Sequence, residues 1–265
     1  MNFIDLLKDL LNTDSAGLAI AMFVVMVLIA IFALIGVGIS IFLFFKYHKL
    51  NKTKNSIGMT GQDIARKVLD DNGLQKIKIK CAGSILWGNS YSHVWKKIRL
   101  RRLTYKKKSV TALAMAVQKS SLAIMDKEGD PIMKARNKLI PLQMFGPLMF
   151  LPMVIIGVIL DIFLIKSDSY IATFVAAGLG IAFYVLAFVL TGVILKAETA
   201  AQAKSIEIMK AEQLATDDEI EKIKELYKLY NLEYINTMIL AFLELVLRVL
   251  QLIAKLKSGS TTSSN

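Results

Sequence analysis

The stretch AGLAIAMFVVMVLIAIFALIGVGISIFLFF, residues 16–45, decides the fold class because it holds 30 consecutive residues without a charge. About 20 apolar residues in a helix are enough to cross a bilayer. The stretch is too long for the apolar core of a cleaved signal peptide, and no small-residue cleavage site follows it, so we expect a retained anchor. The whole chain has 265 residues, of which 55% are hydrophobic, and a mean hydropathy of +0.52. This composition excludes an ordinary soluble domain.

Three further segments are apolar enough to span a membrane, at residues 139–165, 170–195 and 232–253. In the last of them, Glu244 and Arg248 are four residues apart, and we expect them to pair on one helix face. The fold class predicted is therefore a mainly α membrane protein. It has four transmembrane helices and a small α+β cytoplasmic domain between the first and second spans.

Lysine and arginine are distributed unevenly around these spans. Of the 33, 22 lie in residues 46–138 and 6 in residues 196–231, whereas the N-terminal leader, the loop at 166–169 and the C-terminal tail hold 1, 1 and 2. The positive-inside rule places both basic connections in the cytoplasm and both termini outside. A single cysteine rules out internal disulfides, which is consistent with a cytoplasmic main domain.

The segments that flank the spans are assigned from local patterns. Residues 1–15 are expected to be an extracytoplasmic leader that lies as an amphipathic helix on the membrane surface, because its apolar residues recur at helical spacing. Residues 196–231 are expected to be a cytoplasmic helical segment. Residues 254–265, which end in SGSTTSSN, are expected to be a disordered tail.

The basic connection at residues 46–138 has the pattern of a small mixed domain. Thr60 and Asp63 form a capping-box-like start and Asn72-Gly73 a stop, so we expect a helix over residues 61–71. Residues 76–80 and 95–101 alternate with period two and are expected to pair as strands. Residues 87–95 are expected to form a loop. A second helix is expected over residues 109–126, with its apolar residues along one stripe.

The stretch KKIRLRRLTYKKK, residues 96–108, carries eight cationic side chains in 13 residues. Beside a membrane, such a run favours contact with anionic lipid head groups, each contact contributing about 1 kcal/mol near the surface. An acidic protein is the alternative partner for this run. Part of the excess of basic residues follows simply from the positive-inside rule. No nucleic acid is expected, because no RNA-binding motif accompanies the run. The predicted lipid-facing patch consists of Lys96, Lys97, Arg99, Arg101, Arg102, Lys106, Lys107 and Lys108.

Two stretches carry a resemblance to a known family. SIGMTGQDIARKVLDDNGL (residues 56–74) and IRLRRLTYKKKSVTALAMAV (residues 98–117) resemble the YugP-type neutral zinc metallopeptidases of bacterial membranes. The resemblance extends from Ser56 to Leu252, with the apolar segments in matching places. It implies a metalloprotease-like domain, the plasma membrane of a bacterium, and a zinc-binding His-Glu-x-x-His motif after the small-residue run.

At the place where that motif is expected, the chain has Gln-Lys-Ser-Ser-Leu. Gln118 and Leu122 stand at the histidine positions and Lys119 at the position of the catalytic glutamate. Two histidines four residues apart share one helix face and hold one zinc ion, and the glutamate polarises the bound water. Glutamine is a poor zinc ligand, leucine is none, and an ammonium is no base at neutral pH. Glu198 matches the downstream acid that the resemblance implies as third ligand.

The rest of the sequence offers no replacement ligand set, because it holds only His48, His93 and Cys81 beside its carboxylates. A catalytic zinc needs about three protein ligands, so we expect no cofactor. Our first hypothesis is a catalytically inactive homologue that acts as a membrane scaffold or partner-binding protein. The alternatives are an active peptidase with non-standard ligands, such as Glu198 with His93, and an anionic-lipid-binding membrane protein.

The expected partners are the lipid bilayer and either a membrane protein or a second copy of this chain. A substrate groove that has lost its catalytic groups can still bind a peptide segment through backbone edges. We therefore expect partner contacts around residues 87–95 and 118–122. The polar residues of the second stretch have a simpler interpretation as a satisfied helix surface. Without the other ligands, Glu198 is expected to be either an acid in the first turn of a helix or the partner of a lysine.

Overall fold

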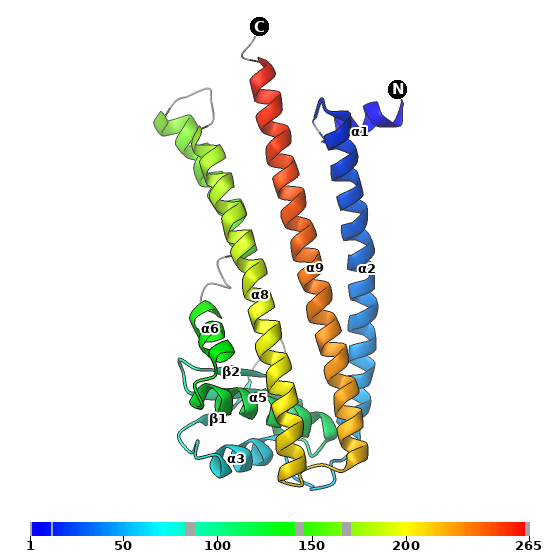
Figure 1. Ribbon diagram of the computed structural model, residues 1–265, viewed down its shortest axis with the longest axis vertical. Helices are drawn as coiled ribbons and strands as arrows, with labels where there is room; N and C mark the ends of the chain where they lie inside the picture. The colour runs from blue at the N-terminus through cyan, green and yellow to red at the C-terminus, as the bar shows by residue number, and fades with distance from the viewer. Residues whose placement is uncertain (1, 12, 83–87, 141–145, 166–170, 263–265) are drawn as a thin grey trace. The chain divides into compact units, whose positions relative to one another are not determined.

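The computed structural model describes residues 2–11, 13–82, 88–140, 146–165 and 171–262 (Figure 1). The chain divides into two compact units. One comprises Met1–Val37, Ile140–Thr191 and Ile235–Asn265, and the other comprises Gly38–Leu139 and Gly192–Tyr234. The first unit contains most of the apolar helical residues. The second contains the sheet and the helix that includes residues 118–122.

Three described helices are long and apolar enough to cross a membrane: α2 (Ala16–Lys52), α8 (Ile171–Ala211) and α9 (Asp217–Thr262). The segment predicted as the second span is an apolar helix α7 (Gly146–Ile159), which continues into a π-helical turn η2 (Leu160–Ile165). Its described apolar helical part is shorter than the other three. The structure thus confirms a mainly helical membrane protein, and the fourth span stays a prediction.

Within the first unit, η2 and α7 pack against the start of α8. Asp161 is buried and accepts hydrogen bonds from the backbone N–H groups of Ala172 (2.9 Å) and Thr173 (2.7 Å) and from the Thr173 hydroxyl (2.7 Å). A helix leaves its first N–H groups without partners, and a carboxylate there satisfies them. The single charge in the predicted second span therefore caps the next helix. Gly157 allows the close approach, because a Cβ there would lie 2.8 Å from the Ala172 carbonyl oxygen.

The two ends of the chain give one confirmed helix and one correction. The predicted leader helix is present as α1 (Phe3–Leu11), with Leu7 buried and the Phe3 ring 5.6 Å from that of Phe23. The disordered tail predicted from residue 254 is wrong for residues 254–262, because α9 stays helical through Thr262. Ala254 is buried, so packing extends the helix beyond its apolar window.

The sheet of the second unit contains β1 (Lys78–Ala82), β2 (Ser90–Ser92) and β3 (Lys97–Arg101), in the order β1-β3-β2. The two predicted strands do pair, with β1 parallel to β3, although β1 starts two residues later than expected because the Ile77 N–H closes a turn on the Leu74 carbonyl. The predicted loop at residues 87–95 contains β2, which pairs antiparallel with β3. Period two is confirmed in β3, where Ile98 and Leu100 are fully buried.

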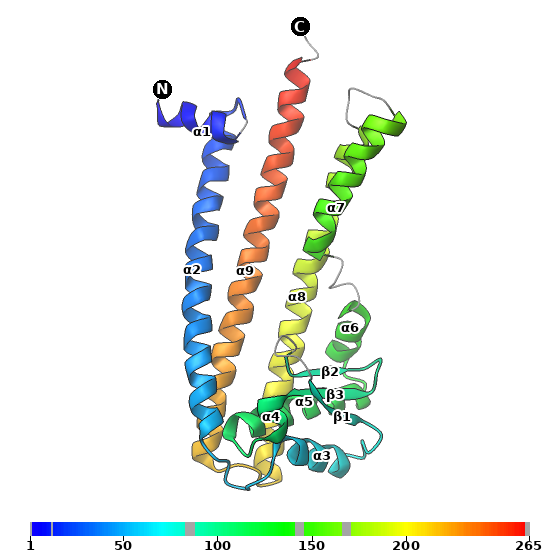
Figure 2. The same cartoon turned by 180° about the vertical axis from the view of Figure 1, so that it is seen from behind.

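The helices of this unit surround α5 (Val110–Lys127), which begins at the predicted cap Ser109. On one side of it lies α3 (Gly61–Asp71), with the predicted capping box of Thr60 and Asp63. The short helices α4 (Arg102–Lys106) and α6 (Pro131–Leu139) and the strands β2 and β3 also contact α5 (Figure 2). Gly61 is required where α3 meets α4, because a Cβ there would lie 2.1 Å from the Thr104 carbonyl oxygen.

The core of this unit includes residues from beyond the predicted domain boundary at 138. It takes Ala197, Ala201 and Met209 from α8 and Ile223 and Tyr227 from α9, all buried. The Tyr227 hydroxyl donates to the Ala114 carbonyl (2.8 Å) in the middle of α5. The segment predicted as a separate cytoplasmic helical region at 196–231 therefore belongs to the same folded unit, which residues 46–138 do not complete alone.

Candidate functional site

The candidate site is the contact between α5 and α8 around residues 118–122, where a zinc motif is expected from the sequence. Gln118 and Lys119 lie in the second half of α5, and Glu198 lies on α8, 80 and 79 residues away in sequence. Glu198 Oε2 accepts hydrogen bonds from Gln118 Nε2 (3.0 Å) and Lys119 Nζ (2.6 Å). The structure therefore brings three of the four predicted vestigial positions together around one carboxylate.

A second cation shares this carboxylate. Arg136 on α6 places Nη2 3.6 Å from Glu198 Oε1. The side chains of Lys119, Glu198 and Arg136 are only 8%, 6% and 6% exposed, so the interaction is shielded from solvent and hardly screened by salt. Of the two roles expected for Glu198, the structure shows the lysine partner, because Glu198 pairs with Lys119 and lies far from the first turn of α8. Arg136 was not singled out from sequence, where it stands unmarked among the other basic residues of 46–138.

The rest of the motif segment is apolar or satisfied locally. Leu122 is fully buried, and the Ser121 hydroxyl donates to the Val117 carbonyl (2.9 Å) one turn earlier. The prediction of one inward stripe with a polar helix surface is wrong, because every residue from Val110 to Met125 is buried. The elements α3, α4, α6, β2 and β3 all pack against this helix. The expected partner contact around residues 118–122 stays a prediction, although these side chains are buried within the chain.

A second polar cluster lies at the end of α5 around Asp126. Its Oδ2 accepts hydrogen bonds from the Tyr91 hydroxyl (2.6 Å) and from His93 Nδ1 (2.6 Å), and its Oδ1 accepts from Asn137 Nδ2 (2.7 Å). Burial opposes ionisation of Asp126, but the hydrogen bonds from His93 and Tyr91 outweigh it and lower the pKa of this carboxyl. Burial and the bond to Asp126 together raise the pKa of the Tyr91 phenol.

The same contacts determine the partner of the His93 ring. Its ring pairs with Asp126 rather than with Glu198. In the part of the chain that the structure describes, no three His, Cys, Asp or Glu side chains converge where they could hold a metal ion. The ligand set of Glu198 with His93, considered from sequence for an active peptidase, is therefore not assembled.

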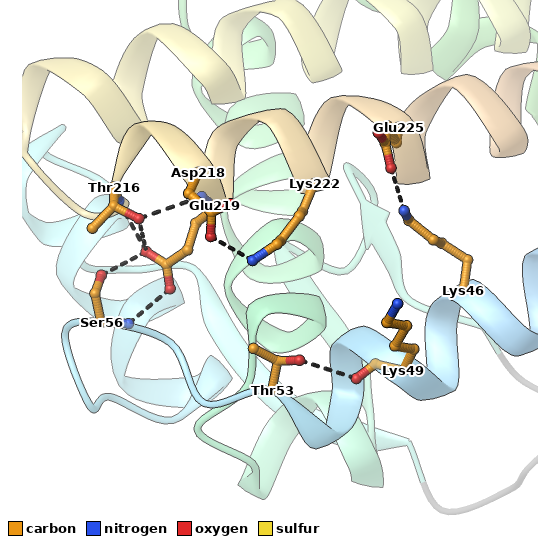
Figure 3. A network of polar contacts seen from close by, with 9 residues as sticks. All are labelled: Lys46, Lys49, Thr53, Ser56, Thr216, Asp218, Glu219, Lys222 and Glu225. Atoms are coloured by element: carbon orange, nitrogen blue, oxygen red, sulfur yellow. Dashed lines mark hydrogen bonds and ion pairs between the residues drawn. The ribbon is translucent and has the colours of Figure 1, made fainter.

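A polar joint connects the chain before α3 to the start of α9 (Figure 3). The Glu219 carboxylate accepts from the Ser56 N–H (2.8 Å) and hydroxyl (2.6 Å) and from the Thr216 N–H (2.9 Å). Lys46 on α2 pairs with Glu225 one and a half turns further along α9. Sequence reasoning missed this joint, although Thr216 followed three residues later by Glu219 is a capping-box pattern.

The predicted basic patch extends from the end of the β2–β3 hairpin to the start of α5. Six of its eight residues are exposed, and Lys97 and Arg99 are half-buried. Two large apolar side chains stand beside it, Val94 and Trp95, which are 71% and 68% exposed. The Lys97 ammonium lies 4.9 Å from the Trp95 ring centroid. The predicted intramembrane pair stays a prediction: Arg248 donates to Gln251 Oε1 (3.1 Å) on the same helix as Glu244.

Comparison with known proteins decides the family. The family described as "Putative neutral zinc metallopeptidase" matches residues 24–254 of the chain, far more than half of it. The chain belongs to this family. Within this zinc metallopeptidase family, "Putative membrane protease YugP" of Bacillus subtilis (strain 168) is 24% identical over 204 residues, covering 76% of this chain and 84% of the relative. No solved structure matches. The resemblance seen in the sequence is thus confirmed.

The residues at the site do not fit the zinc ion that the family description implies. Its ligands would have to come from around Glu198, where the structure has an amide, an ammonium and the apolar Leu122. Zinc binds thiolate, imidazole and carboxylate groups. The one carboxylate present is already hydrogen-bonded to a cation, Lys119 Nζ, which would repel a metal ion. No step of peptide hydrolysis can be derived from these side chains.

Proposed function

We propose that this chain is a catalytically inactive member of the zinc metallopeptidase family that serves as a membrane scaffold or partner-binding protein. The observation that carries the proposal is the 2.6 Å contact between Lys119 Nζ and Glu198 Oε2. Lys119 stands at the position of the catalytic glutamate, and Glu198 at that of the acid expected to bind the metal. Where catalysis needs a glutamate base, this chain has Lys119, and its ammonium neutralises the Glu198 carboxylate that would otherwise bind the metal.

The ion pair also explains how the frame persists without a metal. A structural or catalytic zinc ties together the elements that carry its ligands and adds to folding free energy. Here the ammonium of α5, the amide of Gln118 and the guanidinium of α6 hold the carboxylate of α8 by direct contacts. In this proposal, these contacts join α5, α6 and α8 at the place where a metal centre would otherwise join them.

Metal analysis tests the loss of the catalytic centre. Full-length protein purified in detergent should contain well under one zinc per chain and should not cleave a casein substrate. The matched variant Gln118→His/Lys119→Glu/Leu122→His restores the motif beside Glu198 and should bind about one zinc ion, which the further change Glu198→Ala should remove. Stoichiometric zinc with protease activity in the unaltered chain would overturn the proposal.

The surface that remains for a partner is the tip of the β2–β3 hairpin, since residues 118–122 are buried. Photo-crosslinking amino acids at Ser92 and Trp95 should give protein adducts in cells, whereas one at buried Ser121 should give none. Adducts to lipid alone at both hairpin positions would remove the partner-binding role. The charge distribution supports a proposed topology in a bacterial plasma membrane, with this domain in the cytoplasm and both termini outside.

Anionic lipid binding is a second candidate function, and the exposed Val94 and Trp95 favour it. Aromatic and aliphatic side chains beside lysines are typical of loops that enter the head-group region, the apolar groups adding to the electrostatic attraction. The full chain in nanodiscs should bind phosphatidylglycerol vesicles, and binding should weaken as salt rises. Trp95→Ser should reduce it, whereas Lys67→Ser on α3 should have a smaller effect. Equal binding to neutral vesicles would exclude this function.

A further inference from the structure

The cluster at the former metal position has more positive than negative charge. Lys119 and Arg136 both contact Glu198, whose Oε2 is occupied by Lys119 and Gln118 and whose Oε1 lies 3.6 Å from Arg136 Nη2. One carboxylate balances one cation. The second positive charge, that of Arg136, lies inside the protein on a side chain that is only 6% exposed.

The guanidinium of Arg136 also has hydrogen-bond donors that are not satisfied. Among the described residues, its Nε and Nη1 atoms are buried and have no acceptor. A buried guanidinium normally uses its planar set of N–H donors fully, because each donor removed from water without a partner costs free energy. Arg136 thus has a positive charge and two buried donors that no acceptor among the described residues satisfies.

The neighbouring acid cannot take this role. Asp126 already accepts from Tyr91, His93 and Asn137, at 2.6, 2.6 and 2.7 Å. The phenols of Tyr91 and Tyr234 lie close enough to feel the charge of Arg136. Among the described residues, however, none accepts a hydrogen bond from Arg136 Nε or Nη1.

We propose that the Arg136 guanidinium, next to Lys119, binds a small monovalent anion such as chloride. A single negative charge neutralises the cluster, whereas a divalent anion would bring the excess to the opposite sign beside the Glu198 carboxylate. Burial favours an ion that sheds its hydration shell readily, and the guanidinium is itself weakly hydrated. The position that the family uses for a cation, as its description implies, then holds an anion in this chain.

Thermal unfolding of the full chain in detergent tests the site. Chloride or bromide should replace gluconate at constant sodium concentration and ionic strength, so that screening is unchanged. Tm should rise by about 3–6 °C at an anion concentration tenfold above Kd. Sulfate should give a smaller rise than chloride. A Tm that is equal in chloride and gluconate would overturn the proposal, because water alone would then satisfy Arg136.

Charge variants identify the site. Arg136→Met should abolish the difference between chloride and gluconate, and Lys119→Met should reduce it, because the remaining Arg136 and Glu198 then balance. Glu198→Gln should enlarge it, since two cations lose their carboxylate. Lys67→Met, which removes an exposed lysine of α3 paired with Asp71, should leave it unchanged. If Arg136→Met fails to fold, Lys119→Met and Glu198→Gln decide: equal anion effects in both would refute the site.

Discussion

Replacing Glu198 with glutamine should strongly destabilise the domain that contains it. The change keeps the size of the side chain but removes the carboxylate that contacts both Lys119 and Arg136, whose side chains are 8% and 6% exposed. Breaking a buried ion pair by removing one partner costs about 3–5 kcal/mol, because the remaining charge stays buried without compensation. For a chain of this size, that loss corresponds to a fall in Tm of roughly 6–20 °C.

The double variant separates charge from packing. Lys119→Met alone leaves Glu198 with Arg136, and we expect it to cost less than about 2 kcal/mol, since well-packed apolar replacements of buried ion pairs are often neutral. Lys119→Met added to Glu198→Gln should recover part of the lost stability, because one of the two unpaired cations is gone. Circular dichroism of the full chain in detergent, in gluconate, measures all four Tm values.

The outcome that would refute this reasoning is specific. A Glu198→Gln variant within about 2–4 °C of the unaltered chain, roughly 1 kcal/mol, would mean that the carboxylate does not compensate buried cations. Additive effects in the double variant would mean that Lys119 and Glu198 do not interact. Either result would remove the ion pair as the replacement for a metal centre.

Three further predictions concern the same folded unit. The pKa of Asp126 is lowered in the folded chain. The stabilisation from this carboxylate is therefore fully present above the unfolded pKa of about 3.9 and is lost as the pH falls through the lower folded pKa. Asp126→Asn should make Tm depend less on pH between pH 2 and 5, and an unchanged dependence would contradict this. Gly61→Ala should lower stability by at least 1–3 kcal/mol, because its Cβ would meet the Thr104 carbonyl at 2.1 Å. Gly38→Ala should cost much less, since nothing lies within 4 Å of a Cβ there. Glu219→Gln should cost about 1–2 kcal/mol by weakening the bonds from Ser56 and the cap of α9, and protease cleavage near residue 56 should accelerate.

The sequence by itself determined the class of protein and most local structure. An uncharged run of 30 residues can only be buried in lipid or in a large core, and the chain has too many such segments for a soluble core. Thr60 with Asp63 starts α3 and Ser109 starts α5, because side-chain caps satisfy the first N–H groups whatever the tertiary surroundings are. The family was also readable from its local motifs, since those residues specify local elements.

Only the tertiary structure decided what the unusual residues do. Period and spacing describe one face of α5, but α3, α4, α6 and the strands β2 and β3 pack around it. Residues 118–122 are therefore core and not surface. Arg136 contacts Glu198 because α6 packs against α5. The residues next to Arg136 in sequence do not distinguish it from the other basic residues. The extent of the domain was hidden for the same reason: residues 192–234 complete a core that begins more than 50 residues earlier. Burial and charge balance are properties of side chains brought together from distant segments, and a local pattern cannot contain them.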